Sequence, residues 1–161
     1  LSVCLGLDVS PTPQAPRHPW TSFKTGSWVK ITYHTKMGAA GAHKMSYTMT
    51  LLEVTKEKIK IEYEMNNGGV ATKNVIEQVP GQDPYKTLTK GETGVETLKI
   101  AGKSYRCTWT VYQMDQEQVK GTYKIWSCPS VPGHMVKMDG KYHSGGMDIE
   151  YAAEVEDFKV K

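Results

Sequence analysis

Two histidines near the C-terminus are spaced so that they could share a metal ion. The segment "HMVKMDGKYH" contains an Asp-Gly pair, which is a strong signal for a two-residue hairpin turn. With Met138 paired to Lys141 across that turn, His134 lies diagonally from His143 on one face of the hairpin. Two imidazoles are too few for a structural zinc site, and no third ligand is evident in the sequence. Both are therefore weak metal candidates, and two ordinary surface histidines are the simpler interpretation.

The familiar enzyme motifs are missing from the sequence. It has no Gly-x-Ser-x-Gly, no phosphate-binding loop, no His-Glu-x-x-His and no Gly-x-Gly-x-x-Gly after a strand. His143, Ser144 and Asp148 lie close together in the chain, but neighbours within one strand do not form a catalytic triad by spacing alone. The sequence predicts a protein that is not an enzyme and that uses no cofactor.

Three cysteines, Cys4, Cys107 and Cys128, cannot all pair within one chain. Cys107 and Cys128 lie on the two arms of a hairpin expected over residues 103–128. If the odd-numbered residues face each other across this hairpin, Cys107 lies opposite Ile125 and Cys128 falls on the other side. A disulfide between them then needs a bulge, which the adjoining Pro129 permits. Two buried thiols are the alternative.

The aromatic residues of this hairpin offer a candidate ligand pocket. In the same register Trp109 and Tyr123 share one face, where they could line a hydrophobic pocket together with several methionines. Packing within the core of the sheet is the simpler interpretation of both side chains.

Length and charge restrict the class of protein. A chain of 161 residues with a formal net charge of +3 is most simply one domain, and its lysines and acids alternate instead of forming blocks. This charge is too small to predict binding to nucleic acid or to an anionic membrane. No apolar stretch is long enough to span a bilayer.

Nearly every periodic segment has the two-residue period of a β-strand. In "KIKIEYEM", the residues Ile59, Ile61 and Tyr63 alternate with Lys60 and Glu62, which is typical of an antiparallel strand with one solvated face. Turn signals such as "TKEK" and "NNGG" separate such segments, and no segment combines a helical period with caps. We expect an all-β domain over residues 20–161, with about nine or ten antiparallel strands in a β-sandwich or an open half-barrel.

Residues 1–19 are predicted to form an extended N-terminal arm. The first nine residues alternate as a strand would, and the proline-rich "SPTPQAPRHP" follows as a stiff spacer that could hold them roughly 30 Å from the domain. A strand held away from its own sheet can complete the sheet of another molecule. The apolar residues that would enter such a partner are Leu1, Val3, Leu5, Leu7 and Val9.

Several stretches carry a resemblance to known proteins. "HPWTSFKTGSWVKITY", "YRCTWTVYQ", "YKIWS" and "VPGHMVKM" resemble a group of small exported bacterial proteins of unknown function, in which a Val-Pro-Gly-Gly connector leads into Val-Lys-Met. Here His134 stands in place of the second glycine. That group is distantly similar to periplasmic lipoprotein carriers, whose open half-barrel shelters an acyl chain. The resemblance implies no catalytic residue, and the helical lid of the carriers has no counterpart in this sequence.

Three functions follow as hypotheses. The leading one is a non-enzymatic structural subunit of an extracellular or cell-surface assembly, in which the arm adds a strand to a neighbouring copy and gives a head-to-tail filament. The second is a periplasmic carrier that binds a lipid or another hydrophobic ligand, and the third is an accessory subunit that docks on a larger complex. For all three we expect an extracellular, cell-surface or periplasmic location, with Leu1 close to a mature N-terminus.

Overall fold

A computed structural model describes residues 18–67, 70–83, 85–117 and 119–161. Over these residues the chain forms nine strands and one short 3-10 helix, Gly38–Ala40. All nine strands belong to one sheet, in which every neighbouring pair is antiparallel. The strands are β1 (Trp28–Met37), β2 (Ala42–Val54), β3 (Ile59–Asn67), β4 (Val70–Gln78), β5 (Thr89–Ile100), β6 (Lys103–Gln116), β7 (Val119–Ser127), β8 (Met135–Ser144) and β9 (Met147–Lys159).

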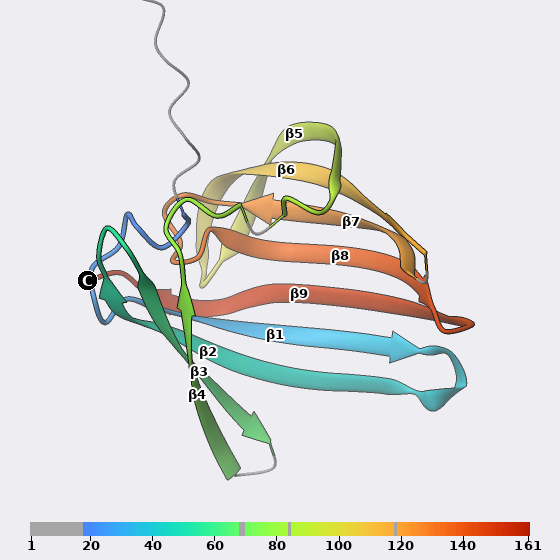
Figure 1. Ribbon diagram of the computed structural model, residues 1–161, viewed down its shortest axis with the longest axis horizontal. Helices are drawn as coiled ribbons and strands as arrows, with labels where there is room; N and C mark the ends of the chain where they lie inside the picture. Colours follow the sequence, from blue (N-terminus) through green and yellow to red (C-terminus); the bar gives the residue numbers. More distant parts are fainter. Residues whose placement is uncertain (1–17, 68–69, 84, 118) are drawn as a thin grey trace, which may run out of the picture.

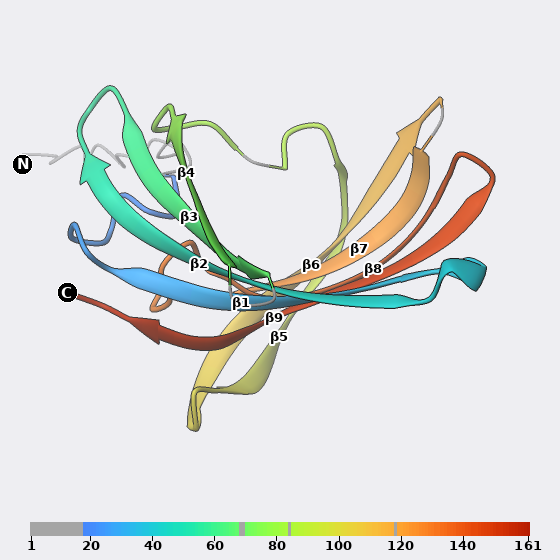
Figure 2. The same ribbon diagram turned by 90° about the horizontal axis from the view of Figure 1, so that it is seen from below.

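The strand order β4-β3-β2-β1-β9-β8-β7-β6-β5 places the first and last strands side by side in the middle of the sheet. From β1 the chain moves outward to one edge at β4, and from β5 at the other edge it returns inward to β9 (Figure 1). The sheet is strongly twisted and curved and does not close, as Figure 2 shows. The all-β class and the open half-barrel are therefore confirmed, and the sandwich is not formed.

The connection between β4 and β5 has to join the two opposite edges of the sheet, because these strands are consecutive in the chain. The described residues of this connection, 79–83 and 85–88, make the crossing over the concave side (Figure 2), and we call them loop 79–88. We call this side the inner face and define it by Val29, Ile31 and Tyr33 of β1, whereas Lys30 and His34 point to the outer face.

Aliphatic side chains at one end of the sheet form the best-packed part of the core. Val29, Leu51, Ile59 and Ile61 are each fully buried. Trp20 and other side chains of the connecting segments 18–27 and 128–134 join the same cluster. Burying such an aliphatic side chain contributes about 1.5–3 kcal/mol before ordering costs. This end is therefore the firmly packed part of the molecule.

The prediction of a hairpin turn at Asp139-Gly140 is wrong. β8 runs unbroken through both residues, and its partners on either side are continuous from Lys137 to Ser144. The reason is packing from a neighbouring strand. A Cβ atom at Gly140 would lie 2.5 Å from Cδ1 of Tyr123, so the glycine leaves space for an aromatic ring and does not make a turn.

The predicted register of the β6–β7 hairpin is also wrong, by one residue. Gln116 pairs with Val119, so odd-numbered residues of β6 face even-numbered residues of β7. Trp109 therefore lies opposite Trp126, and Tyr123 lies opposite Tyr112.

Candidate functional site

Tyrosines cover most of the inner face. The chain has nine tyrosines, and all except Tyr105 lie on this face or, for Tyr85, on the loop above it. Those on the strands are partly exposed, so their rings form a surface and not a sealed core. They are Tyr33, Tyr47, Tyr63, Tyr112, Tyr123, Tyr142 and Tyr151.

The rings contact one another across neighbouring strands. Tyr33 lies between Tyr47 and Tyr151, with ring centroids 5.0 Å and 5.5 Å away. Tyr123 and Tyr142 stack at 6.1 Å on the other half of the sheet. Aromatic pairs of this geometry are worth about 0.5–1.5 kcal/mol beyond the area they bury. The inner face is thus a pre-arranged aromatic surface.

Charge is separated between the two faces of the sheet. In β1–β4 and β7–β9, no described Asp, Glu, Lys or Arg occupies an inner-face position in the strand registers. Between the tyrosines stand methionines and aliphatic residues, such as Met49, Met138 and Ile149. A sheet face without charge is usually buried by a second layer. Here much of it stays partly exposed beneath one loop.

The tyrosine hydroxyls of the inner face are neutral at physiological pH, and burial moves the ionisation of Tyr33, Tyr63 and Tyr151 to still higher pH. It raises the pKa of Tyr33 to about 12, with the nearby Tyr63 and Tyr47 adding to the effect. Burial likewise raises the pKa of Tyr151, whose hydroxyl is hydrogen-bonded to that of Tyr33. At physiological pH these phenols carry no charge. The inner face therefore presents apolar rings with a few hydrogen-bonding hydroxyls.

The loop over the inner face is fixed to it by an aromatic contact. The ring of Tyr85 lies 5.1 Å from that of Tyr112, inclined by 30°. Burial raises the pKa of Tyr85 to about 12, with contributions from Tyr112 and Tyr33. Tyr85 thus lies close to the tyrosine surface. Residues 79–88 occupy the position of a cover, which the sequence did not reveal because the loop has no periodic pattern.

The ligand pocket expected between Trp109 and Tyr123 is not formed by this pair. In the observed register Tyr123 is on the inner face, whereas Trp109 is on the outer face beside Trp126. Trp109 packs there over Gly94, where a Cβ atom would lie 2.5 Å from its ring. Of the two predicted pocket residues, only Tyr123 belongs to the inner-face surface.

The two cysteines of this region come together. Thr108 pairs with Ser127, so Cys107 and Cys128 occupy adjoining positions on neighbouring strands without the bulge that the sequence seemed to require. Both are buried free thiols, 1 % and 2 % exposed. Burial, followed by the proximity of Cys128, raises the pKa of Cys107 to about 11. A disulfide between them stays a prediction.

The two histidines proposed as weak metal ligands are far apart. His134 precedes β8 and His143 lies near its other end, so about 30 Å of extended strand separates them. His134 packs against Phe23, and His143 forms a 2.8 Å contact with Asp148. The described part of the chain brings no three His, Cys, Asp or Glu side chains together as metal ligands. His134 and His143 are therefore too far apart to bind one metal ion together.

No family model matches the chain. No curated protein matches it either. One of the solved structures that match the chain has a TM-score above 0.5. A "putative lipoprotein" from Parabacteroides distasonis is 12% identical with a TM-score of 0.55, and the match covers 91% of this chain and all of that one.

Two more distant structures are described as a "putative outer membrane lipoprotein-sorting protein domain" from Vibrio parahaemolyticus and a LolA superfamily protein from Nitrosomonas europaea. They are 6% and 8% identical, with TM-scores of 0.36 and 0.29, and each match covers 85% of this chain and 86% of the other. The structure from Parabacteroides distasonis therefore shares the fold of this chain.

Residues 1–17 of the N-terminal arm predicted over residues 1–19 lie outside the described residues, which begin at His18. This applies to all its proposed contact residues, Leu1, Val3, Leu5, Leu7 and Val9, and to Cys4. The described part of the chain contains no helix with the length and hydropathy needed to cross a bilayer.

Proposed function

We propose that the protein is an exported, non-enzymatic binding or carrier protein whose inner face holds a hydrophobic ligand such as a lipid acyl chain. The observation that carries this proposal is the separation of charge between the two faces of the sheet. Over the described residues of β1–β4 and β7–β9 the inner face carries no charged side chain and is only partly covered, whereas the lysines, aspartates and glutamates of these strands lie on the outer face. A bound acyl chain would complete the burial that a single sheet leaves unfinished.

Loop 79–88 is the element that would cover the ligand. It crosses the inner face between the two edges of the sheet (Figure 2). The ring contact between Tyr85 and Tyr112 holds it there. The neutral tyrosine hydroxyls beneath it could bind a polar group at the end of an apolar chain. This arrangement takes the place of the helical lid that the sequence lacks.

The fold and the neighbours support a location outside the cytoplasm. The similar structures are named as lipoproteins and lipoprotein-sorting proteins. Extracellular, cell-surface or periplasmic placement is the location we propose for this chain, in agreement with the expectation from sequence.

The structural-subunit hypothesis, which led the sequence analysis, gains no support. It depends on residues 1–9, which lie outside the described part of the chain. Light scattering on the full chain and on a variant without residues 1–10 separates the two ideas. A filament protein loses its self-association on deletion, whereas a carrier keeps its ligand binding.

A carboxylate placed on the inner face tests the proposal. Met45 lies on this face opposite Tyr33 and is 39% exposed, so Met45→Glu should not unfold the protein. Binding of a pyrene-labelled fatty acid, measured by energy transfer from the tyrosines and tryptophans, should weaken roughly ten-fold because the new charge loses its hydration against the acyl chain. The matched control is Thr48→Glu, which adds the same single charge on the outer face of the same strand and should leave the affinity unchanged. Equal affinities for both variants would remove the inner face as the site.

A further inference from the structure

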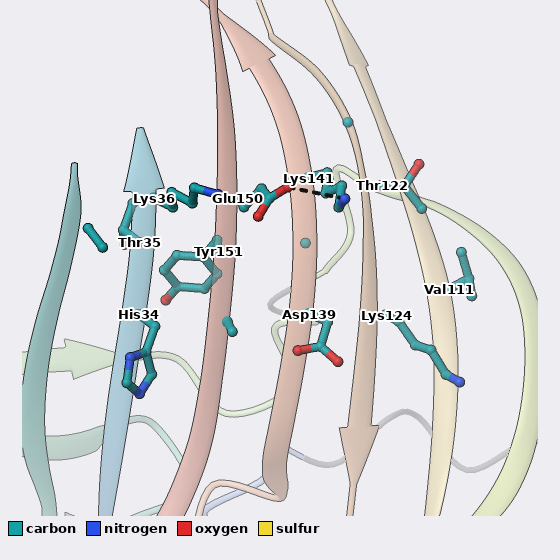
Figure 3. Close-up of a pocket in the computed structure, with 14 residues that line it drawn as sticks. His34, Thr35, Lys36, Val111, Thr122, Lys124, Asp139, Lys141, Glu150 and Tyr151 are labelled. Carbon is teal, nitrogen blue, oxygen red and sulfur yellow. Dashed lines mark ion pairs between the residues drawn. The ribbon is translucent and has the colours of Figure 1, made fainter. Parts of the chain in front are cut away.

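The outer face carries a groove of about 710 Å³ that the proposed carrier function does not use. Figure 3 shows it from the side opposite to loop 79–88, with side chains from β1, β9, β8, β7 and β6 around it. Such a volume suits a small organic molecule of one or two rings. We therefore asked which chemistry its walls would recognise.

Two cross-strand rows of side chains form the groove. The first row crosses four strands, and its residues in order from β1 to β7 are Lys36, Glu150, Lys141 and Thr122. In the second row Ala152 separates His34 from Asp139, and the row continues to Lys124 and Val111.

The floor of the groove is low because its central residues are small. Ala152 fills little space between His34 and Asp139, which lie on either side of β9 in Figure 3. The glycines 121 and 140 also belong to the lining. Both glycines are required by tyrosines on the opposite face, since a Cβ atom at either would lie within about 2.5 Å of Tyr142 or Tyr123. Packing on the inner face thus helps to hollow the outer one.

Lys124 is held in place beside the groove. Its Nζ lies 4.2 Å from the ring centroid of Trp109 and 4.6 Å from that of Trp126. The indole of Trp126 is itself fixed, because its Nε1–H donates a 2.7 Å hydrogen bond to Glu96. Contacts to both rings restrict the ammonium group, so an anion would meet a cation that has already lost much of its rotamer freedom.

The groove has more positive charge than its own carboxylates neutralise. Glu150 forms an ion pair with Lys141 at 3.2 Å, which Figure 3 marks with a dashed line. Asp139 pairs at 3.2 Å with Lys137. Lys36 and Lys124 form no ion pair with another side chain of the described residues. They stand at opposite sides of the groove, three strands apart along the rows, Lys36 on β1 and Lys124 on β7.

We propose that the outer groove binds a small anion with hydroxyl groups, of the size and chemistry of a sugar phosphate. Lys124 and Lys36 attract the anionic group, while Asp139, Thr122 and His34 supply acceptors and donors for hydroxyls. The charged rim favours an anionic ligand over an acyl chain, and the floor of Ala152 and the two glycines leaves space for its carbon skeleton. This site is independent of the hydrophobic ligand on the inner face.

Titration calorimetry with glucose 6-phosphate on the full chain tests the site, with glucose and inorganic phosphate as separate arms. Saturable binding of glucose 6-phosphate that weakens with added salt is the expected result. Lys124→Met and Lys36→Met should each weaken it about five- to ten-fold, since methionine keeps an apolar stem but removes the charge. The matched control Lys56→Met removes the same charge from the β2–β3 turn and should change nothing.

Several outcomes would overturn the site. Absence of saturable binding would do so, as would equal affinity in Lys124→Met and Lys56→Met. If glucose binds as tightly as glucose 6-phosphate, the lysines do not select an anion. If inorganic phosphate binds as tightly as glucose 6-phosphate, the site does not recognise the hydroxyl groups. Met45→Glu should leave this binding intact, so failure of the inner-face ligand and failure of this site are distinguishable.

Discussion

The ring of Tyr123 lies against the backbone of Gly140 on the neighbouring strand. The two residues pair directly in the β7–β8 register, and a Cβ atom at Gly140 would come within 2.5 Å of Cδ1 of the tyrosine. The next tyrosine along, Tyr142, stacks on the same ring at 6.1 Å. This contact explains both why β8 is unbroken at an Asp-Gly pair and why half of the aromatic inner face is ordered.

The first prediction concerns Gly140. Gly140→Ala should lower the free energy of unfolding by about 1–3 kcal/mol, because the methyl group displaces the Tyr123 ring from the sheet. Urea unfolding followed by near-ultraviolet circular dichroism measures this loss. Gly91→Ala is the control, since its Cβ would lie 3.3 Å from the carbonyl oxygen of Val111 and should cost less. A loss below about 0.5 kcal/mol at position 140 would contradict the packing described.

The second prediction concerns Cys107 and Cys128. Because they adjoin across β6–β7 and are both buried, an oxidising compartment with a disulfide-exchange catalyst should link them. The loop closed by this Cys107–Cys128 disulfide should stabilise the protein by about 3 kcal/mol. Alkylation in denaturant without reductant, followed by peptide mass spectrometry, should leave both unmodified. If both are alkylated in protein taken from the periplasm, they are structural thiols.

The third prediction is a loss of stability in acid from a pair of buried histidines. Burial lowers the pKa of His18, partly offset by a hydrogen bond to Gln78, and lowers the pKa of His134, with His18 adding to the effect. Nε2 of His134 is buried without a hydrogen-bond partner among the described residues. The imidazoles of the unfolded chain bind protons more readily than the buried ones do. The stability that the two neutral histidines contribute is therefore fully present above about pH 6.5 and is lost as the pH falls below that value.

The melting temperature should therefore fall between about pH 7.5 and pH 5, and His134→Gly should reduce the fall. Glycine also suits the backbone at this position, where φ is 60°. The exposed His43→Gln serves as control and should retain the full pH dependence. Identical pH profiles for His134→Gly and the unaltered protein would exclude His134 as a cause.

The fourth prediction concerns the cover over the inner face. Tyr85→Ala removes the stack on Tyr112, worth about 0.5–1.5 kcal/mol, and should speed release of a fatty-acid probe by roughly two- to ten-fold. Stopped-flow displacement measures the rate. Lys86→Ala, in the same loop, should release the probe at the original rate. If both variants behave alike, the loop does not retain the ligand.

Much of the fold was predictable because it depends on local pattern. The alternation of Ile59, Ile61 and Tyr63 with charged residues fixes which side of β3 is solvated, and the "TKEK" turn joins it to β2 as expected. The separation of charge between the faces follows from the same alternation, repeated in strand after strand.

The features that the sequence could not supply depend on contacts between distant residues. Asp139-Gly140 has the composition of a turn, and only the ring of Tyr123 shows why glycine is there. The short β6–β7 connection carries no Gly or Asn near Gln116 to mark its length, so the sequence pattern alone predicts a register one residue away from the observed one and puts Trp109 on the opposite face. The crossing of loop 79–88 follows from the position of β4 and β5 at opposite edges, which no local signal encodes.

The most direct measurement is photo-crosslinking with a diazirine-labelled fatty acid, followed by peptide mass spectrometry. An acyl ligand beneath loop 79–88 predicts adducts on Tyr33, Tyr151 and Met49, together with residues of the loop. Adducts confined to outer-face strand positions such as Thr122 and Val111, or none above the level of denatured protein, would show that the uncharged inner face does not hold a hydrophobic ligand.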